Sequence, residues 1–284
     1  MSIKYRPLDD SRDEIRLLDL LPSVDRESHL RCRVRHVSIK DAQYQALSYA
    51  WGDSTEREEI DVEYGPRDPS NNQMDEVFHT TVGASLASAL HHLRDKNLVF
   101  TLWADAICID QKNNDEKSVQ VQLMAKIYQT ASQVIVWLGS ACEGSDAAMD
   151  ALAEVGREAE GFYFEPLVAG MFRKMSDPRT WETENPVDDK GVTMKSFLEK
   201  ISRQSSDTGK GVIPLIELEA LTKRPWWRRV WVLQELFLGS TVTFACGHRR
   251  LLDTHFGLAL ASFFGFYHIS MLKSPVRNSE MPEY

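Results

Sequence analysis

Hydrophobic and polar positions change period repeatedly between Tyr44 and Gly139, which indicates a chain that switches between strands and helices. Near-continuous apolar runs of strand length cover residues 44–51, 98–104 and 133–138. Apolar residues recur at helical spacing over residues 82–93 and 116–130. Such apolar runs are typical of strands covered on both faces. Strands and helices alternating at these lengths predict right-handed crossovers and a parallel sheet flanked by helices, so the expected fold class is α/β.

The segment from about residue 143 to 215 is rich in charge and in turn signals such as Asn185-Pro186. Helical patches at 146–158 and 194–201 predict a helical insertion in the same domain rather than a second domain. Later patterns predict helices at 215–221 and 226–238, a strand at 241–246 and a final apolar helix from Asp253. We therefore expect one domain over residues 1–250, with a C-terminal helix and tail over 251–284.

The net charge and the cysteine content of the chain argue against some classes of function. The 284 residues hold 33 Lys+Arg against 42 Asp+Glu, a net charge of −9, and nucleic-acid binding needs clustered positive charge. We therefore expect no nucleic acid as a partner. The 4 cysteines form no CxxC pair, and the first residues after Met1 are charged, which together favour a cytoplasmic protein without a signal peptide. Phe256–Leu272 lacks Asp, Glu, Lys and Arg over 17 residues, and we expect a buried helix there rather than a membrane span.

Polar side chains follow two of the predicted strands at the point where each strand ends. Ligands of open parallel sheets bind outside these carboxyl ends. The first cluster contains Ser48, Tyr49, Trp51 and Asp53, and the second contains Asp105 and Gln111. Carboxylates, aromatic rings and amides at one sheet edge are typical of a small-molecule site. Asp53 and Asp110 have an alternative role as caps of the helices that follow.

A third cluster lies in Arg224–Leu236, where 3 tryptophans occur within 6 residues. On a continuous helix, Arg228, Trp231 and Glu235 share one face at positions i, i+3 and i+7. A carboxylate beside an indole is partly desolvated, and it suits binding of sugar hydroxyls and stabilisation of positive charge on a ribose ring. The alternative is an Arg–Glu pair on a helix surface, beside tryptophans that belong only to the core.

Several familiar sites are missing from the sequence. It has no GxGxxG, GxxxxGK[ST], HExxH or GxSxG motif, and its histidines show no metal-ligand spacing, so we expect no metal. Cys108 follows a strand, but its apolar neighbours raise a thiol pKa and no partner base is evident. We expect a buried structural cysteine.

Three blocks resemble the signature blocks of the fungal heterokaryon-incompatibility (HET) domain. They are ALSYAWGD (Ala46–Asp53), LWADAICIDQ with the segment that continues to Gly139 (from Leu102), and RRVWVLQEL (Arg228–Leu236). The opening YRPLDDSRDEIRLLDLLP is also similar to the start of that family, and the resemblance runs in order from about Tyr5 to Gly247. The chain departs from the family at Asp110 and Ser85, where the family commonly has Asn.

The resemblance implies a flavodoxin-like sheet related to TIR domains, and a role in fungal non-self recognition and regulated cell death. RVWVLQEL is also similar to the segment that carries the catalytic glutamate of NAD-cleaving TIR enzymes: Trp231 matches its Trp, Glu235 matches its Glu, and Val232 stands where many have Cys. Carried across, the resemblance implies NAD as substrate with no further cofactor, activation by homo-oligomer assembly, and a non-self-sensing partner protein.

Two hypotheses of different classes follow. The first is an enzyme that cleaves the nicotinamide–ribose bond, with Glu235 as catalytic residue and with Ser48, Tyr49, Trp51, Asp53, Asp105, Gln111, Arg228 and Trp231 in the substrate site. The second is a non-catalytic signalling module that self-associates, in which Glu235 pairs with Arg228. A generic nucleotide-binding protein is a weaker third, because no phosphate-binding glycine loop is present. Whether Glu235 opens into a cleft with the aspartates separates the first two.

Overall fold

The computed structural model describes residues 3–52, 55–64, 76–160, 196–197, 214–230, 235–236 and 238–273. The chain forms two compact units. Unit 1 comprises residues 1–143 and 220–252, and unit 2 comprises residues 144–219 and 253–284.

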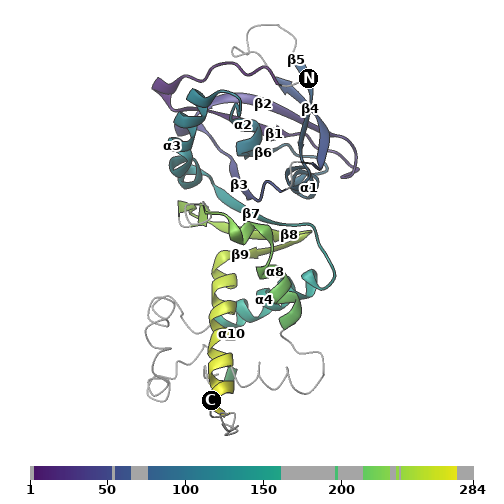
Figure 1. The fold of residues 1–284 in the computed structure, drawn as a ribbon, viewed down its shortest axis with the longest axis vertical. Helices are drawn as coiled ribbons and strands as arrows, with labels where there is room; N and C mark the ends of the chain where they lie inside the picture. Colours follow the sequence, from purple (N-terminus) through teal and green to yellow (C-terminus); the bar gives the residue numbers. More distant parts are fainter. Residues whose placement is uncertain are drawn as a thin grey trace, which may run out of the picture. The chain divides into compact units, whose positions relative to one another are not determined.

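The described strands of unit 1 form one sheet in the order β5-β4-β2-β1-β6-β3-β7-β8-β9 (Figure 1). The strands are β1 (Glu14–Leu20), β2 (Leu30–Ser38), β3 (Gln45–Tyr49), β4 (Arg57–Tyr64), β5 (Glu76–Gly83), β6 (Phe100–Trp103), β7 (Gln133–Gly139), β8 (Val242–Cys246) and β9 (Arg249–Leu252). The helices are α1 (Ala84–Leu93), α2 (Asp105–Cys108) and α3 (Asn114–Thr130), and short 3-10 turns cover Asp10–Arg12, Ile39–Asp41 and Pro225–Arg228.

The centre of the sheet is parallel. Strand β3 pairs in parallel with β6 and β7, and β7 pairs in parallel with β8. Across the sheet the parallel strands lie in the order β6-β3-β7-β8. Numbered by their order in the chain, this is 2-1-3-4, which is the order in which a flavodoxin-like sheet begins. The α/β class is confirmed, and the finer flavodoxin-like and TIR-like assignment stays a prediction.

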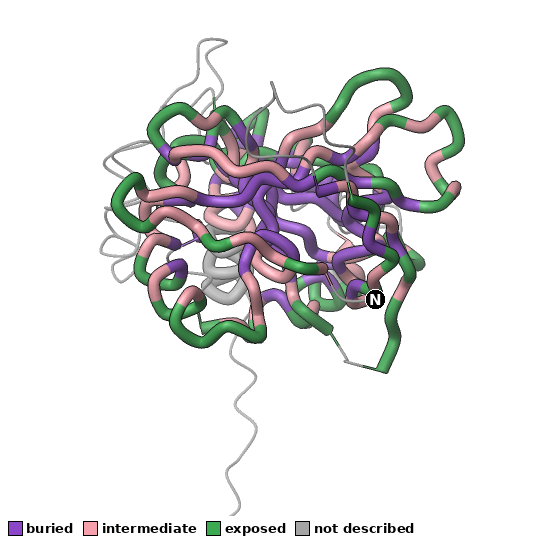
Figure 2. Tube along the Cα trace, turned by 90° about the horizontal axis from the view of Figure 1, so that it is seen from above, coloured by how far each residue is buried: buried purple, intermediate pink, exposed green. Residues whose placement is uncertain are grey.

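The parallel strands are buried because both of their faces are covered. Every residue of β8 is buried, as are five consecutive residues of β7. Figure 1 shows α1 and α3 on opposite sides of β3 and β7, and Figure 2 shows buried stretches along the strands with exposed residues at the turns. Helix α3 begins where the sequence predicts, because the Asn113 side chain accepts hydrogen bonds from the backbone N–H groups of Asp115 and Glu116.

The sheet is mixed rather than purely parallel, which corrects the sequence-based expectation. Strand β1 is antiparallel to both β2 and β6, and β4 is antiparallel to β5. Strand β2 has the period-2 pattern of a half-buried strand, since Leu30, Cys32 and Val34 are buried while Arg31 and Arg33 are exposed. These N-terminal strands extend the parallel centre on the side of β6.

Unit 2 is helical in its described part. It contains α4 (Ser145–Glu160) and α10 (Asp253–Lys273), which pack on each other, and α8 (Leu215–Thr222) begins in this unit. Phe256, Leu258 and Ala259 are buried, so the described first part of the apolar C-terminal segment is a buried helix, as expected. The patch predicted at 194–201 lies outside the described residues except for 196–197.

The predicted insertion at 143–215 nearly coincides with the first segment of unit 2, residues 144–219. The structure groups this insertion with α10, whereas the sequence analysis places it in the same domain as the sheet. Within the described parts of the chain, no helix combines the length and the apolar character that crossing a membrane requires.

Candidate functional site

The candidate site lies at the carboxyl ends of the parallel strands. Among the four parallel strands of the centre, β6 is the next after β3 in the chain and lies on one side of it, and the later strand β7 lies on the other side. The strand order therefore reverses at β3, and the crevice outside such a switch point is where open α/β sheets bind ligands. Two side-chain clusters meet this edge, one around Asp105 and one around Glu235.

The Asp105 cluster consists of Tyr49, Trp51, Asp105 and Gln111. Asp105 begins α2, two residues after the end of β6, and its carboxylate accepts hydrogen bonds from the Tyr49 hydroxyl (2.9 Å) and from the Trp51 indole N–H (2.9 Å). The Gln111 side-chain amide donates to the Asp105 backbone carbonyl (2.8 Å). Tyr49 is buried, whereas Trp51 is 49% exposed. The cluster thus places an aromatic ring that reaches solvent beside a carboxylate.

The Glu235 cluster consists of Ser48, Trp226, Arg229 and Glu235. The Arg229 guanidinium donates to both oxygens of Glu235 at 2.8 Å and 2.9 Å, and the Ser48 hydroxyl donates to the same carboxylate. The Trp226 indole N–H donates to Ser48 Oγ (2.6 Å). Glu235 has no exposed surface, while the Arg229 side chain is 19% exposed. The carboxylate is therefore held at the end of β3, but in a closed ion pair.

Arg229 links the two clusters electrostatically. Desolvation raises the pKa of Asp105 above its usual value, while the hydrogen bonds from Trp51 and Tyr49 and the charge of Arg229 oppose the rise. Desolvation also raises the pKa of Tyr49 well above its usual value, and the charge on Asp105 adds to the effect. Tyr128 on α3 has its pKa raised by burial first and by Glu235 next. The two carboxylates and these phenols thus form one electrostatically coupled group.

The prediction of a continuous helix over 226–238 is wrong at its start. Pro225–Arg228 is a 3-10 turn, and Arg229 is extended, with φ −81° and ψ 138°. Arg228 is exposed and lies outside both clusters, and the partner of Glu235 is Arg229. Arg228 and Glu235 therefore do not share the predicted continuous helix face, because the helical spacing is interrupted after Arg228.

Two predicted site residues, Asp53 and Trp231, lie outside the described residues. The structure brings Ser48 to Glu235, and it brings Tyr49, Trp51 and Gln111 to Asp105. Sequence reasoning missed Arg229, Trp226 and Tyr128 as members of the site. Arg229 is adjacent to Arg228, the residue that the sequence analysis paired with Glu235. Only the local backbone conformation decides which of the two arginines contacts Glu235.

Two residues weighed in the sequence have structural roles. Burial raises the pKa of the Cys108 thiol to about 12, so this side chain is a protonated core group, as expected. Asp110 accepts a hydrogen bond from the Lys112 backbone N–H (3.0 Å), which closes a turn.

Neither cluster forms an open cleft around Glu235, since both of its oxygens are bonded to protein donors and none of its surface is exposed. The ion pair does not face away from the strand ends either. Its neighbour Ser48 belongs to β3, and the charge of Arg229 lowers the pKa of Asp105. Glu235 is therefore held in a closed ion pair beside the end of β3.

Comparisons with known proteins place the chain in a family. The family model described as "Heterokaryon incompatibility protein (HET)" matches residues 44–235, a range that contains both clusters. The chain is 35% identical over 256 residues to "Heterokaryon incompatibility protein 6, OR allele" of Neurospora crassa, covering 85% of this chain. The match spans only about a third of that relative, 34% of its length. No solved structure matches the chain significantly. The chain belongs to the heterokaryon incompatibility (HET) family.

Proposed function

We propose that this chain hydrolyses NAD at the nicotinamide–ribose bond and that self-assembly switches the activity on. One observation carries the proposal: a buried carboxylate, Glu235, is held against Ser48 at the switch point of a parallel sheet. The strand order 2-1-3-4 of the parallel centre supports a relation to TIR domains. The sequence resemblance matches Glu235 to the glutamate with which NAD-cleaving TIR enzymes carry out catalysis.

The proposed reaction needs little acid catalysis, because nicotinamide leaves from a positively charged ring nitrogen. The C1′–N bond breaks and its electron pair neutralises that nitrogen, so positive charge develops on the ribose. Water then bonds to C1′ and loses a proton, which gives ADP-ribose and nicotinamide. Glu235 stabilises the developing charge and binds the ribose hydroxyls, and Ser48 fixes the orientation of the carboxylate. The Asp105 cluster, which includes Trp51, lines the dinucleotide site.

Arg229 sets the condition for activity. In the closed site its guanidinium neutralises Glu235 through two hydrogen bonds, so the carboxylate is not available to a ribose. A substrate must replace Arg229, and a buried ion pair opens only if new contacts compensate for its loss. We propose that contacts between assembled copies of the chain move Arg229 away from Glu235.

The test compares two neighbouring substitutions in purified protein supplied with NAD. Glu235→Gln keeps the side-chain shape and is expected to lower nicotinamide release at least about 100-fold, since it removes the charge that stabilises the transition state. Arg228→Gln is the matched control, because Arg228 is exposed and outside both clusters, and it is expected to retain wild-type release. Glutamine is chosen over alanine because it keeps the side-chain volume and one acceptor oxygen for Arg229, whereas alanine would also leave a cavity.

Equal NAD turnover by Glu235→Gln and wild type contradicts the assignment of Glu235. Turnover lost equally in both variants contradicts the separation of Arg228 from the site. Circular dichroism and thermal unfolding of each variant check that the fold is retained.

A second function is favoured by the closed ion pair itself. If Glu235 never exposes its carboxylate, the Glu235 cluster serves as core, and the chain is a non-catalytic self-associating module for incompatibility signalling. This alternative predicts no NAD loss by any assembled form, and it predicts that Glu235→Gln affects stability alone.

The name of the Neurospora relative supports a biological setting for either function. We propose that the chain acts in heterokaryon incompatibility, as a cytoplasmic homo-oligomer that triggers cell death. A non-self-sensing protein that promotes assembly is the proposed partner.

A further inference from the structure

Two cysteine side chains of unit 1 lie beside the same arginine. Arg224 Nη2 donates a hydrogen bond to Cys142 Sγ (3.0 Å) and a longer one to Cys246 Sγ (3.9 Å). Because both sulfurs contact one nitrogen, they are separated by at most about 7 Å, the sum of these two distances. All three residues belong to unit 1.

The two cysteines differ in their access to solvent. Cys142 is exposed, and it lies between β7 and α4 in a segment that is neither helix nor strand. Cys246 ends β8 and is fully buried. An oxidant in solution therefore reaches Cys142 first. An accessible thiol that reacts first, with a second thiol close by to resolve the product, is typical of redox-sensing cysteines.

The backbone holds the two cysteine-bearing segments together. Gly139 pairs in register with Cys246, and the Gly247 N–H donates to the Gly139 carbonyl (2.9 Å). A Cβ at Gly247 would lie 2.8 Å from the Cβ of Ala141, so the chain neighbours of the two cysteines are in contact. A disulfide at about 2 Å then requires rotation of the two side chains and a small shift of the irregular segment that carries Cys142.

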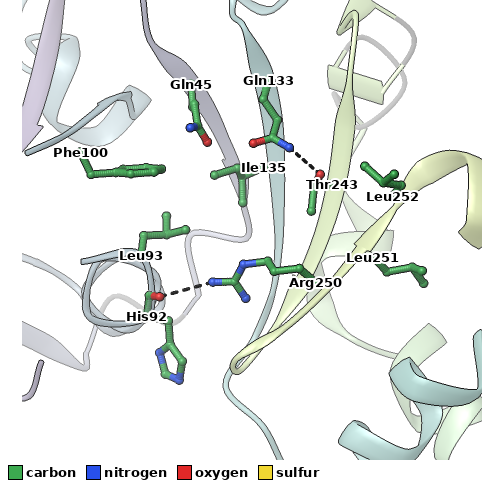
Figure 3. A pocket seen from close by; sticks show the side chains of 10 residues that line it. All are labelled: Gln45, His92, Leu93, Phe100, Gln133, Ile135, Thr243, Arg250, Leu251 and Leu252. Carbon is green, nitrogen blue, oxygen red and sulfur yellow. Dashed lines mark hydrogen bonds between the residues drawn. The ribbon is translucent and has the colours of Figure 1, made fainter. Parts of the chain in front are cut away.

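The Arg224 guanidinium is anchored where it can act on the sulfurs. Both of its terminal nitrogens donate to the Ser140 carbonyl at 3.1 Å. Arg250 on β9 differs, since its guanidinium donates to three backbone carbonyls, and Figure 3 shows the bond to His92 at the cavity that Arg250 lines. The thiolate is the reactive form of cysteine, and a neighbouring guanidinium attracts its negative charge. Arg224 thus supplies positive charge at both sulfurs.

We propose that Cys142 and Cys246 form a redox-sensing pair that a hydroperoxide converts into a disulfide. The Cys142 thiolate attacks one peroxide oxygen, the O–O bond breaks, and the other oxygen takes the thiol proton and leaves as water or an alcohol. The Cys246 sulfur then bonds to the sulfenic sulfur of Cys142, the S–O bond breaks, and the hydroxyl leaves with the Cys246 proton as water. Two thiols lose two electrons in total, and the peroxide gains them.

The disulfide joins the end of β8 to the connection that leads out of unit 1. Cys142 lies two residues before Gly144, where unit 2 begins. Oxidation therefore fixes the start of this connection, and reduction releases it. Arg224 is a positioning residue for the pair. The proposal does not depend on NAD hydrolysis.

Exposure of the purified wild-type chain to hydrogen peroxide tests the pair. Peptide mass spectrometry after alkylation is expected to find a Cys142–Cys246 disulfide within one chain, which dithiothreitol reverses. Cys32 and Cys108 are internal controls and are expected to stay thiols, because burial raises the pKa of each to about 12. Absence of the Cys142–Cys246 bond, or Cys142 bonded instead between two chains, overturns the proposal.

Three variants and a matched control assign the roles. Cys246→Ser lacks the resolving thiol and is expected to accumulate a sulfenic acid at Cys142 that dimedone labels, unlike wild type. Arg224→Gln is expected to slow disulfide formation about tenfold, as loss of a charge-assisted hydrogen bond predicts. Arg224→Lys keeps the charge and is expected to restore the rate. Arg228→Gln, an exposed arginine in the turn that follows, is the control and is expected to oxidise as wild type.

Equal oxidation rates of Arg224→Gln and Arg228→Gln overturn the role of Arg224. Dimedone labelling that Cys246→Ser leaves unchanged overturns the role of Cys246. The wild-type peptide map decides if a variant fails to fold.

Discussion

Glu235 and Asp105 are carboxylates at one edge of the sheet, but their surroundings differ. Glu235 is fully buried and bound by a guanidinium, whereas Asp105 is bound by the neutral donors of Tyr49 and Trp51. The pKa of Asp105 is raised because desolvation outweighs these hydrogen bonds. Carboxylates in unlike environments can take different roles in one site. Here Glu235 is paired with the Arg229 guanidinium, whereas the pKa of Asp105 is raised by desolvation.

Asp105→Asn tests this difference through the pH dependence of stability. Because the folded-state pKa of Asp105 lies above its usual 3.8, the folded chain binds a proton at a pH where the unfolded chain does not. Stability from this group is therefore fully present below the unfolded pKa and is lost as pH rises through the folded pKa. The unfolding free energy of wild type relative to Asp105→Asn is expected to increase as pH falls from neutral toward 4.

Urea denaturation of both proteins at several pH values measures this difference. A difference that stays constant or shrinks as pH falls contradicts the raised pKa of Asp105.

Sequence reasoning succeeded for residues whose position follows from a strand end. Ser48 and Tyr49 end β3, and Asp105 lies two residues after β6, so the edge they share was predictable. The arginine of the site was not, because Pro225 begins a 3-10 turn and the chain is extended at Arg229. A shift of one residue along the chain decides whether Arg228 or Arg229 faces Glu235, and helical periodicity in the sequence cannot reveal such a shift.

Among the elements, those buried on both faces were the easiest to predict. Strands β3 and β7 and helix α3 agree with the sequence pattern within a few residues. The N-terminal strands were missed, although the alternation in β2 was visible, because charged residues at every second position obscure a strand that is buried on one side only. The mixed sheet follows from these additional strands.

Gly156 on α4 tests the packing of the two helices that form unit 2. A Cβ at Gly156 would lie 2.2 Å from the backbone oxygen of His255 on α10, so any side chain forces the helices apart. Gly156→Val is expected to destabilise the chain by about 1–3 kcal/mol, the usual cost of overpacking. Glu154→Val, an exposed position on the same helix, is the control for the helix propensity of valine.

Thermal unfolding measures the loss of stability, and the rate of limited proteolysis of the two valine variants shows whether α4 and α10 have separated. Equal stability of the two valine variants contradicts the close contact of these helices.

At the scale of the whole molecule, unit 1 joins a parallel centre to an antiparallel extension and gathers its polar groups at the switch point of the centre. The α/β class and the sheet edge of the site followed from the sequence. The closed state of Glu235 did not, since an ion pair between Arg229 and Glu235 depends on how the segment after Pro225 docks on Ser48. In the proposed function, this closed ion pair is the physical reason to expect NAD hydrolysis only after assembly.

The most direct test of this account is nicotinamide release per chain, measured over a wide range of protein concentration for wild type and Glu235→Gln. The account predicts that release per wild-type chain rises as sedimentation shows assembly, and that the variant assembles equally but releases nicotinamide at the background rate. Wild-type assemblies that leave NAD intact, or release that survives Glu235→Gln, would contradict it.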